Sequence, residues 1–267
     1  MTTFKELSSM NGRRVLITGG AGFLGKVMAE TLAELGASII LLDKPSVDFE
    51  GIKDSLENKF SVSCVCIECD LEFEEDRNRA IQEIKTNGGE LNCLINNAAF
   101  VGASALEGWS VPFEEQSLAT WRRALEVNLT APFHLVQAFT PELKMSHGGN
   151  IVNIASIYGS LGPDWRLYDG TEMGNPAAYG VSKGGIAQLT RWLATTLAPD
   201  VRCNAISPGG IFRNQPADFV GRYVNKTPLN RMAIEDDFRG AIAYLASDQS
   251  KYVTGQVISV DGGWGTW

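Results

Sequence analysis

Arg13-Arg-Val-Leu-Ile-Thr-Gly-Gly-Ala-Gly-Phe-Leu-Gly25 is the stretch that decides the fold. Residues 13–18 are a short apolar run that predicts a β-strand, and residues 23–35 carry the apolar periodicity of a helix. The glycines between them permit a tight turn, and the helix start offers free N–H groups and a positive dipole end to a phosphate. A glycine pattern between a strand and a helix predicts a dinucleotide-binding loop.

Apolar runs and helical patterns alternate along the rest of the chain. Strands are predicted at residues 38–42, 62–67, 91–95, 150–155, 201–206 and 256–260, and helices at 74–85, 118–144, 177–198 and 235–246. Such alternation favours a parallel sheet with right-handed crossovers. The expected fold class is therefore α/β: a single Rossmann-like domain, residues 1–267, with a doubly wound parallel sheet and helices on both faces.

Three connections interrupt this alternation. Residues 100–115 form a longer connection, and residues 159–176 form a loop rich in glycine, proline and aromatic residues. Residues 211–231 are expected to be irregular or to form short helices, and they are suited to a lid. Long loops without periodicity often line a site. Within the 118–144 helix, Asn128 lies in an apolar stretch with a proline four residues later. This predicts a local irregularity or bend, unless the backbone simply satisfies the amide.

Polar residues follow several of the predicted strands. Asp43 ends the 38–42 run, Asp70 comes after the third strand and Asn97 after the fourth. Ligands bind beyond the carboxyl ends of the strands in open α/β sheets, so these side chains are candidates for a cofactor site. An acidic group at position 43 accepts hydrogen bonds from an adenosine ribose and repels a 2′-phosphate, which favours NAD over NADP. Lys44 beside it opposes part of that preference.

The segment Tyr179-Gly-Val-Ser-Lys183 begins a predicted helix. Residues four apart on a helix share one face, about 5–6 Å apart, so a phenol lies beside an ammonium. An adjacent positive charge favours the phenolate, and Tyr179 is then able to exchange a proton with a substrate oxygen. The same spacing occurs by chance on many helices, so the pair gains meaning only from its context.

The composition opposes some classes of function. Lys and Arg number 23 against 31 Asp and Glu, a formal net charge of −8, which opposes generic binding to nucleic acid or to anionic membranes. No 18-residue apolar stretch occurs, and residues 1–10 lack the basic start and apolar run of a signal peptide. We therefore expect a soluble, cytoplasmic protein.

The five cysteines are interpreted as free thiols in a reducing compartment, because four of them fall in strand-like apolar runs. Cys66 and Cys69 form a C-x-x-C pair, but in an extended strand they point to opposite faces, and no second Cys/His pair stands nearby. His134 and His147 are interpreted as structural or surface residues. We therefore expect no metal site.

Several short motifs occur in one order along nearly the whole chain: Thr18-Gly19-x-x-Gly22-x-x-Gly25, Asp70-Leu71, Asn96-Asn97-Ala98-Ala99, Asn128, Ser156, Tyr179-x-x-x-Lys183 and Pro208-Gly209. Together they resemble the short-chain dehydrogenase/reductase superfamily. The resemblance implies an oxidoreductase with a Rossmann fold, which moves hydride between a nicotinamide cofactor and an alcohol or carbonyl.

The resemblance also implies roles for single residues. Tyr179 is expected to be the general acid/base, and Lys183 to lower its pKa and bind the nicotinamide ribose. Ser156 is expected to hydrogen-bond the reacting substrate oxygen, and Asn128 to hold a water that joins Lys183 to solvent. The implied cofactor-binding residues are Gly19, Gly22, Phe23, Leu24, Gly25, Asp43, Asp70, Leu71, Asn97, Ala98, Tyr179, Lys183, Pro208, Gly209 and Ile211.

Two branches of the superfamily are represented in the motifs. Phe23 stands where shorter members usually place Gly, as in the longer, sugar-nucleotide-modifying branch. The chain length, the Tyr179–Lys183 helix and the ending from Tyr252 to Gly263 look like the shorter branch, which we favour because these features cover more of the chain. The interval from Ser156 to Tyr179 is longer than usual in that branch, which leaves the substrate open.

The segments 156–159, 163–171 and 207–216 look most like bacterial oxidoreductases of flagellin-glycosylation and nonulosonic-acid pathways. This implies carbohydrate metabolism, with a phosphorylated or otherwise anionic sugar bound near Ser156 and Tyr179. Arg166 and Arg213 are the expected anion partners, since guanidinium suits bidentate binding of oxyanions. Alternatively, Arg166 is a surface residue paired with Asp164 or Asp169.

Other functions stay open beside this one. The glycine spacing admits a sugar-nucleotide epimerase or dehydratase with retained NAD, and a catalytically idle nucleotide-binding scaffold is the alternative outside enzymes. A complete set of Ser156, Tyr179 and Lys183 favours the enzyme. The resemblance further implies a homo-oligomer, a tetramer or dimer, built on the 118–144 and 177–198 helices and on the C-terminal segment.

Overall fold

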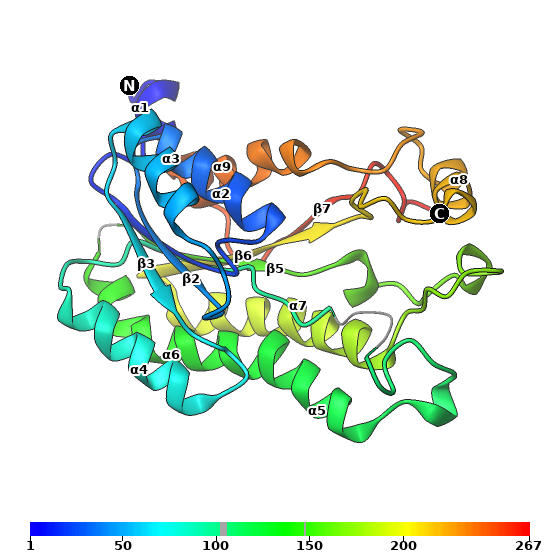
Figure 1. Ribbon diagram of the computed structural model, residues 1–267. Helices are drawn as coiled ribbons and strands as arrows, with labels where there is room; N and C mark the ends of the chain where they lie inside the picture. Colours follow the sequence, from blue (N-terminus) through cyan, green and yellow to red (C-terminus); the bar gives the residue numbers. More distant parts are fainter. Residues whose placement is uncertain (102–105, 147) are drawn as a thin grey trace.

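The computed structural model describes residues 1–101, 106–146 and 148–267. Within them lies a seven-stranded parallel sheet in the order β3-β2-β1-β4-β5-β6-β7 (Figure 1). The strands are β1 (Arg14–Thr18), β2 (Ser38–Asp43), β3 (Cys64–Glu68), β4 (Cys93–Asn96), β5 (Gly149–Ile154), β6 (Val201–Pro208) and β7 (Val257–Val260). The strand order reverses between β1 and β4, which is where open α/β sheets bind their ligands.

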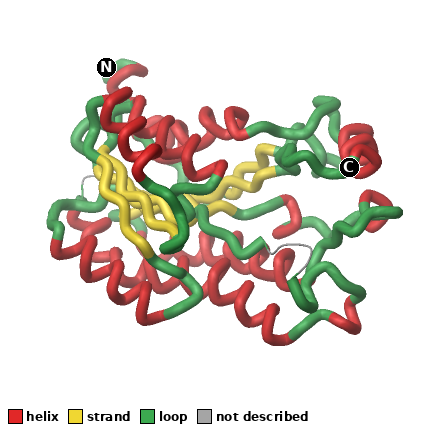
Figure 2. The backbone as a smooth tube through the Cα atoms, in the orientation of Figure 1, coloured by secondary structure: helices red, strands yellow, loops and turns green. Residues whose placement is uncertain are grey.

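Helices cover both faces of the sheet, as Figure 2 shows in red around the yellow strands. One face carries α2 (Phe23–Glu34), α3 (Glu50–Phe60) and α9 (Arg239–Ala246), and the other carries α4 (Glu74–Thr86), α5 (Leu118–Leu125), α6 (Ala131–Met145) and α7 (Ala177–Leu197). The short α1 (Phe4–Ser8) lies at the N-terminus, and α8 (Ala217–Lys226) lies near the C-terminus. The predicted doubly wound α/β fold is confirmed.

The strands bury both of their faces, which explains why they are continuous apolar runs. Leu16, Ile40 and Leu94 pack into one core with α4, α6 and α7, whereas Val15 and Ile17 pack into the other with α2 and α9. No helix of the described chain is long and apolar enough to cross a membrane.

Two helices, α1 and α3, are absent from the sequence-based prediction. Only Leu56 is buried in α3, so the helix shows little apolar periodicity. The helix α8 is one of the short helices expected within residues 211–231, and Phe219 and Tyr223 are its buried residues. The 118–144 segment is helical but contains a π-helical turn at Glu126–Thr130, which confirms the irregularity at Asn128.

The predictions for the 159–176 loop, for His134 and for the cysteines agree with the structure. The segment 159–176 is a loop with a 3₁₀ turn at Trp165–Leu167. His134 is half-buried and accepts a hydrogen bond from Arg77, as a structural residue would. The five cysteines are free. Part of the predicted 100–115 connection and His147 lie outside the described residues.

Candidate active site

A cavity of about 700 Å³ lies at the carboxyl ends of the strands. It has the size of an ordinary ligand site. Every residue predicted to bind the cofactor lines this cavity, and so do Ser156 and Arg213. The structure therefore brings together in one place residues that are spread over almost two hundred positions of sequence.

The glycine loop between β1 and α2 is shaped by close backbone contacts. Gly19 has φ of 62°, a left-handed conformation that favours glycine. A Cβ atom on Gly25 would lie 2.1 Å from the carbonyl oxygen of Gly19, so only glycine fits there. Gly22 precedes α2, and no side chain caps the helix. The first-turn N–H groups thus remain available to a pyrophosphate, and the loop fits a dinucleotide.

Asn97 and Thr18 hold this loop against β4. The Asn97 amide donates to the carbonyl oxygens of Thr18 and Gly19, at 3.0 Å each. The Thr18 hydroxyl accepts from the backbone N–H groups of Asn97 and Ala98, also at 3.0 Å. Asn97 is therefore a positioning residue whose amide is used by the loop.

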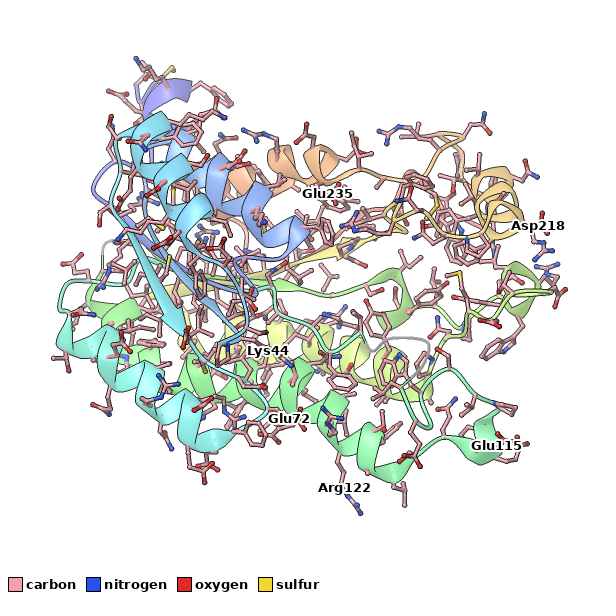
Figure 3. The ribbon with its side chains drawn as sticks, viewed as in Figure 1. Lys44, Glu72, Glu115, Arg122, Asp218 and Glu235 are labelled. Atoms are coloured by element: carbon pink, nitrogen blue, oxygen red, sulfur yellow. The ribbon has the colours of Figure 1, made fainter. Side chains whose placement is uncertain are left out.

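The adenosine end of the cavity is marked by Asp43 at the end of β2. Its carboxylate accepts from the Ala21 N–H at 2.9 Å and from the Lys44 N–H at 2.8 Å. Lys44, labelled in Figure 3, has its ammonium 3.6 Å from the carboxylate of Asp70. Because Lys44 is paired with Asp70, it does not neutralise Asp43. This end of the cavity therefore keeps a net negative charge.

Ser156, Tyr179 and Lys183 meet between this cofactor end and the opposite end of the cavity. Ser156 follows β5, and its hydroxyl accepts from the Tyr158 N–H at 3.2 Å. Lys183 is 3% exposed; its ammonium donates to the Ile154 carbonyl oxygen at 2.7 Å and lies 5.9 Å from the centroid of the Tyr179 ring. A Cβ on Gly159 would lie 2.6 Å from the Lys183 carbonyl oxygen, so the turn after Ser156 is packed directly on α7.

Burial shifts both titrating groups toward their neutral forms. It lowers the pKa of Lys183 to about 8, and it raises the pKa of Tyr179, while the hydroxyl of Ser156 opposes the latter rise. The direction for Tyr179 is opposite to the lowered pKa expected from its pairing with Lys183. In the structure the Lys183 ammonium donates to the Ile154 carbonyl oxygen. The largest effect on the pKa of Tyr179 is the desolvation of its phenolate, which raises it.

Asn128 is buried and does not line the cavity. Its Oδ1 accepts from the Phe100 N–H at 2.5 Å, and its Nδ2 donates to the Phe100 carbonyl at 3.2 Å and to the Ser182 hydroxyl at 3.0 Å. The side chain therefore ties the segment after β4 to α7. The water that the resemblance assigns to Asn128 stays a prediction.

The two arginines expected to bind an anionic substrate are both engaged by carboxylates. Arg166 does not line the cavity; its side chain is 84% exposed and makes two hydrogen bonds of 2.8 Å with Asp164. The alternative expectation, a surface pair with Asp164, is what the structure shows. Arg213 lines the cavity, pairs with Glu235, which is labelled in Figure 3, and lies 4.5 Å from the centroid of the Phe23 ring.

A family model described as enoyl-(acyl carrier protein) reductase, from the short-chain dehydrogenase/reductases, matches residues 20–265. The chain belongs to the short-chain dehydrogenase/reductase family. This confirms the resemblance drawn from the sequence motifs, and the nicotinamide cofactor site is a property of the family.

Two relatives in sequence span almost all of this short-chain dehydrogenase/reductase. Post-translational flagellin modification protein A of Campylobacter coli is 29% identical over 258 residues, which cover 96% of this chain and 99% of that protein. A tropinone reductase homolog of Arabidopsis thaliana is 33% identical over 264 residues, which cover 96% of this chain and 93% of that protein.

Solved structures also resemble this chain over almost its whole length. NAD⁺-bound xylitol dehydrogenase has a TM-score of 0.83 at 29% identity and covers 95% of this chain and 99% of its own. NADPH-dependent 3-quinuclidinone reductase from Rhodotorula rubra has a TM-score of 0.89 at 26% identity and covers 100% and 96%. The two structures differ in cofactor, so the fold leaves the choice between NAD and NADP to local residues.

Sequence reasoning missed the side chains at the far end of the cavity from the glycine loop. Trp109, Tyr158, Tyr168, Asn175 and Tyr223 all line it. The only signal was the richness in aromatic residues of the 159–176 segment, which gives no partners for any one residue. In this short-chain dehydrogenase/reductase the segment does reach the site, through Tyr168 and residues 173–176.

Proposed function

We propose that the chain is an NAD-dependent oxidoreductase that transfers hydride between the nicotinamide and a secondary alcohol or ketone of a sugar or polyol. One observation carries the proposal: Ser156, Tyr179 and Lys183 line the same cavity as the glycine loop and Asp43. An acid/base beside a dinucleotide loop is the arrangement that hydride transfer requires.

The bound dinucleotide supplies the carbon that gives or receives hydride. The loop glycines and the start of α2 bind the pyrophosphate, and Asp43 orients the adenosine ribose. Ser156 donates a hydrogen bond to the reacting oxygen and fixes its position. Tyr179 gives that oxygen a proton in reduction and takes one in oxidation. Lys183 binds the nicotinamide ribose and stabilises the phenolate of Tyr179 by its charge.

The carbohydrate part of the proposal is supported by two proteins to which the chain is similar. One is named as a flagellin modification protein, and the other is a xylitol dehydrogenase, an enzyme that acts on a polyol. We place the reaction in glycan or nonulosonic-acid biosynthesis in the cytoplasm. The test is a turnover screen with NAD(H) and NADP(H) against polyols, sugars and their keto forms. The absorbance of NADH or NADPH reports the turnover.

The screen also separates the alternative functions. An idle scaffold binds NAD and turns over none of the compounds. An epimerase or dehydratase purifies with NAD that it retains through dialysis and shows no net change of NADH during turnover. Net NADH formation from a polyol supports the proposed oxidoreductase and contradicts both.

We expect the substitution Asp43→Asn to lower the ratio of kcat/KM for NAD⁺ to that for NADP⁺ by roughly tenfold or more. The amide keeps the shape of the carboxylate but removes the charge that repels a 2′-phosphate. Steady-state kinetics with both cofactors measure the ratio. Asp48→Asn is a matched control, because Asp48 is exposed after the same strand and does not line the cavity. An unchanged ratio in Asp43→Asn contradicts the assignment.

We also propose that the chain forms a homo-oligomer, a dimer or tetramer. An apolar groove on α6 and α7 is lined by Leu129, Phe133, Leu189 and Trp192, and Trp192 is 54% exposed. Large exposed apolar side chains that are contiguous favour association. Light scattering measures the mass in solution, and a monomer at every concentration contradicts the proposal.

A further inference from the structure

The substrate end of the cavity is built from aromatic rings. Tyr168 comes from the 159–176 segment, and Phe219 and Tyr223 come from α8. The ring centroids of Tyr168 and Phe219 are 5.5 Å apart, and those of Phe219 and Tyr223 are 6.0 Å apart. The Tyr223 hydroxyl accepts from the Gly210 N–H at 2.5 Å, and its ring stacks on Trp264 with the centroids 5.7 Å apart. The rings support one another, so this wall is rigid.

Several cations around this wall are already engaged: Arg222 of α8 donates to the backbone carbonyls of Leu167 and Asp169, and others are ion-paired. Asp164 accepts from Arg166 and, at 2.9 Å, from Lys226, and these hydrogen bonds lower the pKa of Asp164 far below its usual range. Arg213 is paired with Glu235. An anionic substrate group would therefore have to displace an existing ion pair or hydrogen bond to gain one of these cations.

The lining itself offers no charge to replace these pairs. Among the described residues that line the substrate end beyond Lys183 and Arg213, the ionisable groups are phenols. Burial raises the pKa of Tyr158, and it raises that of Tyr223 to about 12, so both are neutral near pH 7. Residues 102–105, Gly-Ala-Ser-Ala, add no ionisable side chain. Burying an uncompensated charge here is unfavourable.

A small polar cluster lies on this otherwise apolar wall. The hydroxyl oxygens of Tyr158 and Tyr168 are 2.8 Å apart, and the Asn175 amide donates to the Tyr168 hydroxyl at 3.4 Å. Two phenolic hydrogens are present and the mutual bond uses one of them. The other phenolic hydrogen has no acceptor among the described residues. The Asn175 carbonyl oxygen receives no hydrogen bond from those residues. The cluster is half-buried to buried.

We infer that the substrate is an uncharged polyhydroxy compound, and that Tyr158, Tyr168 and Asn175 select it by hydrogen-bonding a hydroxyl other than the reacting one. The spare phenolic hydrogen and the amide oxygen are a donor and an acceptor, which a hydroxyl group matches. The aromatic wall suits the C–H faces of a sugar or polyol ring. The inference rests on the proposed oxidoreductase function and excludes phosphorylated and carboxylated sugars from it, so that within glycan or nonulosonic-acid biosynthesis the step would be one that acts on a neutral sugar.

The test uses matched probes with NAD⁺: trans-cyclohexane-1,2-diol against cyclohexanol, and galactose against galacturonate. We expect the wild type to prefer the neutral member, galactose, by about tenfold or more in kcat/KM. We expect Tyr168→Phe to lower kcat/KM for the diol by roughly tenfold to hundredfold, mainly through KM, and to leave cyclohexanol within about twofold. Tyr252→Phe is the matched control, because Tyr252 is fully exposed and lies outside the cavity.

Calorimetric binding of the same probes to the enzyme–NADH complex is measured in parallel. If no probe turns over, the proposed oxidoreductase function fails, while weaker binding of the diol to Tyr168→Phe than to wild type still supports the inference. A preference for galacturonate, equal losses for diol and cyclohexanol in Tyr168→Phe, or no binding of any neutral probe overturns it. Unfolding temperatures of the variants show whether each one is folded.

Discussion

Replacement of Tyr179 by phenylalanine is expected to lower kcat for hydride transfer by roughly 10²–10⁴-fold while NAD⁺ still binds. The Tyr179 phenol, beside Ser156 and Lys183, is the group proposed to give the reacting oxygen a proton, and phenylalanine keeps the ring packing that joins Tyr179 to Trp109 and Ala178. The loss should fall on kcat, because the ring is retained and only the proton-transfer step is removed.

The measurement pairs steady-state turnover with calorimetric titration of NAD⁺. Tyr244→Phe is a matched control, because Tyr244 is half-buried on α9, on the opposite face of the sheet. A Tyr179→Phe variant that keeps a substantial share of the wild-type turnover would contradict the assignment of Tyr179 as the general acid/base. Loss of NAD⁺ binding together with turnover would instead mean that the substitution disturbs the fold of the cofactor site.

The cofactor half of the site could be predicted from the sequence because its determinants are local. The glycine loop needs residues without a side chain where a Cβ on Gly25 would meet the Gly19 carbonyl, and such constraints leave a motif. Asp43 and Asn97 follow strands directly, so the parallel sheet alone brings them to one edge. These motifs can be read from short stretches of sequence, although the hydrogen bonds that Asn97 and Asp43 make join distant positions.

The substrate half could not be predicted, because it depends on contacts between distant segments. Arg166 has the chemistry to bind an oxyanion, yet in the structure it pairs with Asp164. Asp164 in turn binds Lys226, which lies sixty residues after Arg166 in the sequence. Tyr158 and Tyr168 become a hydrogen-bonding pair only after the intervening segment folds back. Arg222 of α8 holds that segment by donating to the carbonyls of Leu167 and Asp169, which no periodicity reveals.

Substitution of Lys183 by methionine is expected to lower kcat by roughly 10²-fold or more, because the ammonium that stabilises the Tyr179 phenolate is removed. Methionine has a similar length and is apolar, so it fits a side chain that is 3% exposed. Steady-state kinetics in both directions measure the loss. Lys251→Met, at an exposed position outside the cavity, controls for the loss of one positive charge.

The same substitution is expected to change how stability depends on pH in the protein without cofactor. Burial lowers the pKa of Lys183 from 10.5 to about 8, so below pH 8 the folded state holds a buried ammonium at a cost. Between pH 8 and 10.5 the folded state releases this proton before the unfolded state does, and wild-type stability gains up to about 3 kcal/mol relative to Lys183→Met. Above pH 10.5 both states are neutral and the gain is complete.

The variant also loses the hydrogen bond to the Ile154 carbonyl, which shifts its stability by the same amount at every pH and leaves the slope unchanged. Denaturant unfolding at several pH values gives both curves, and parallel curves over this window would show that Lys183 is not titrating in the folded site.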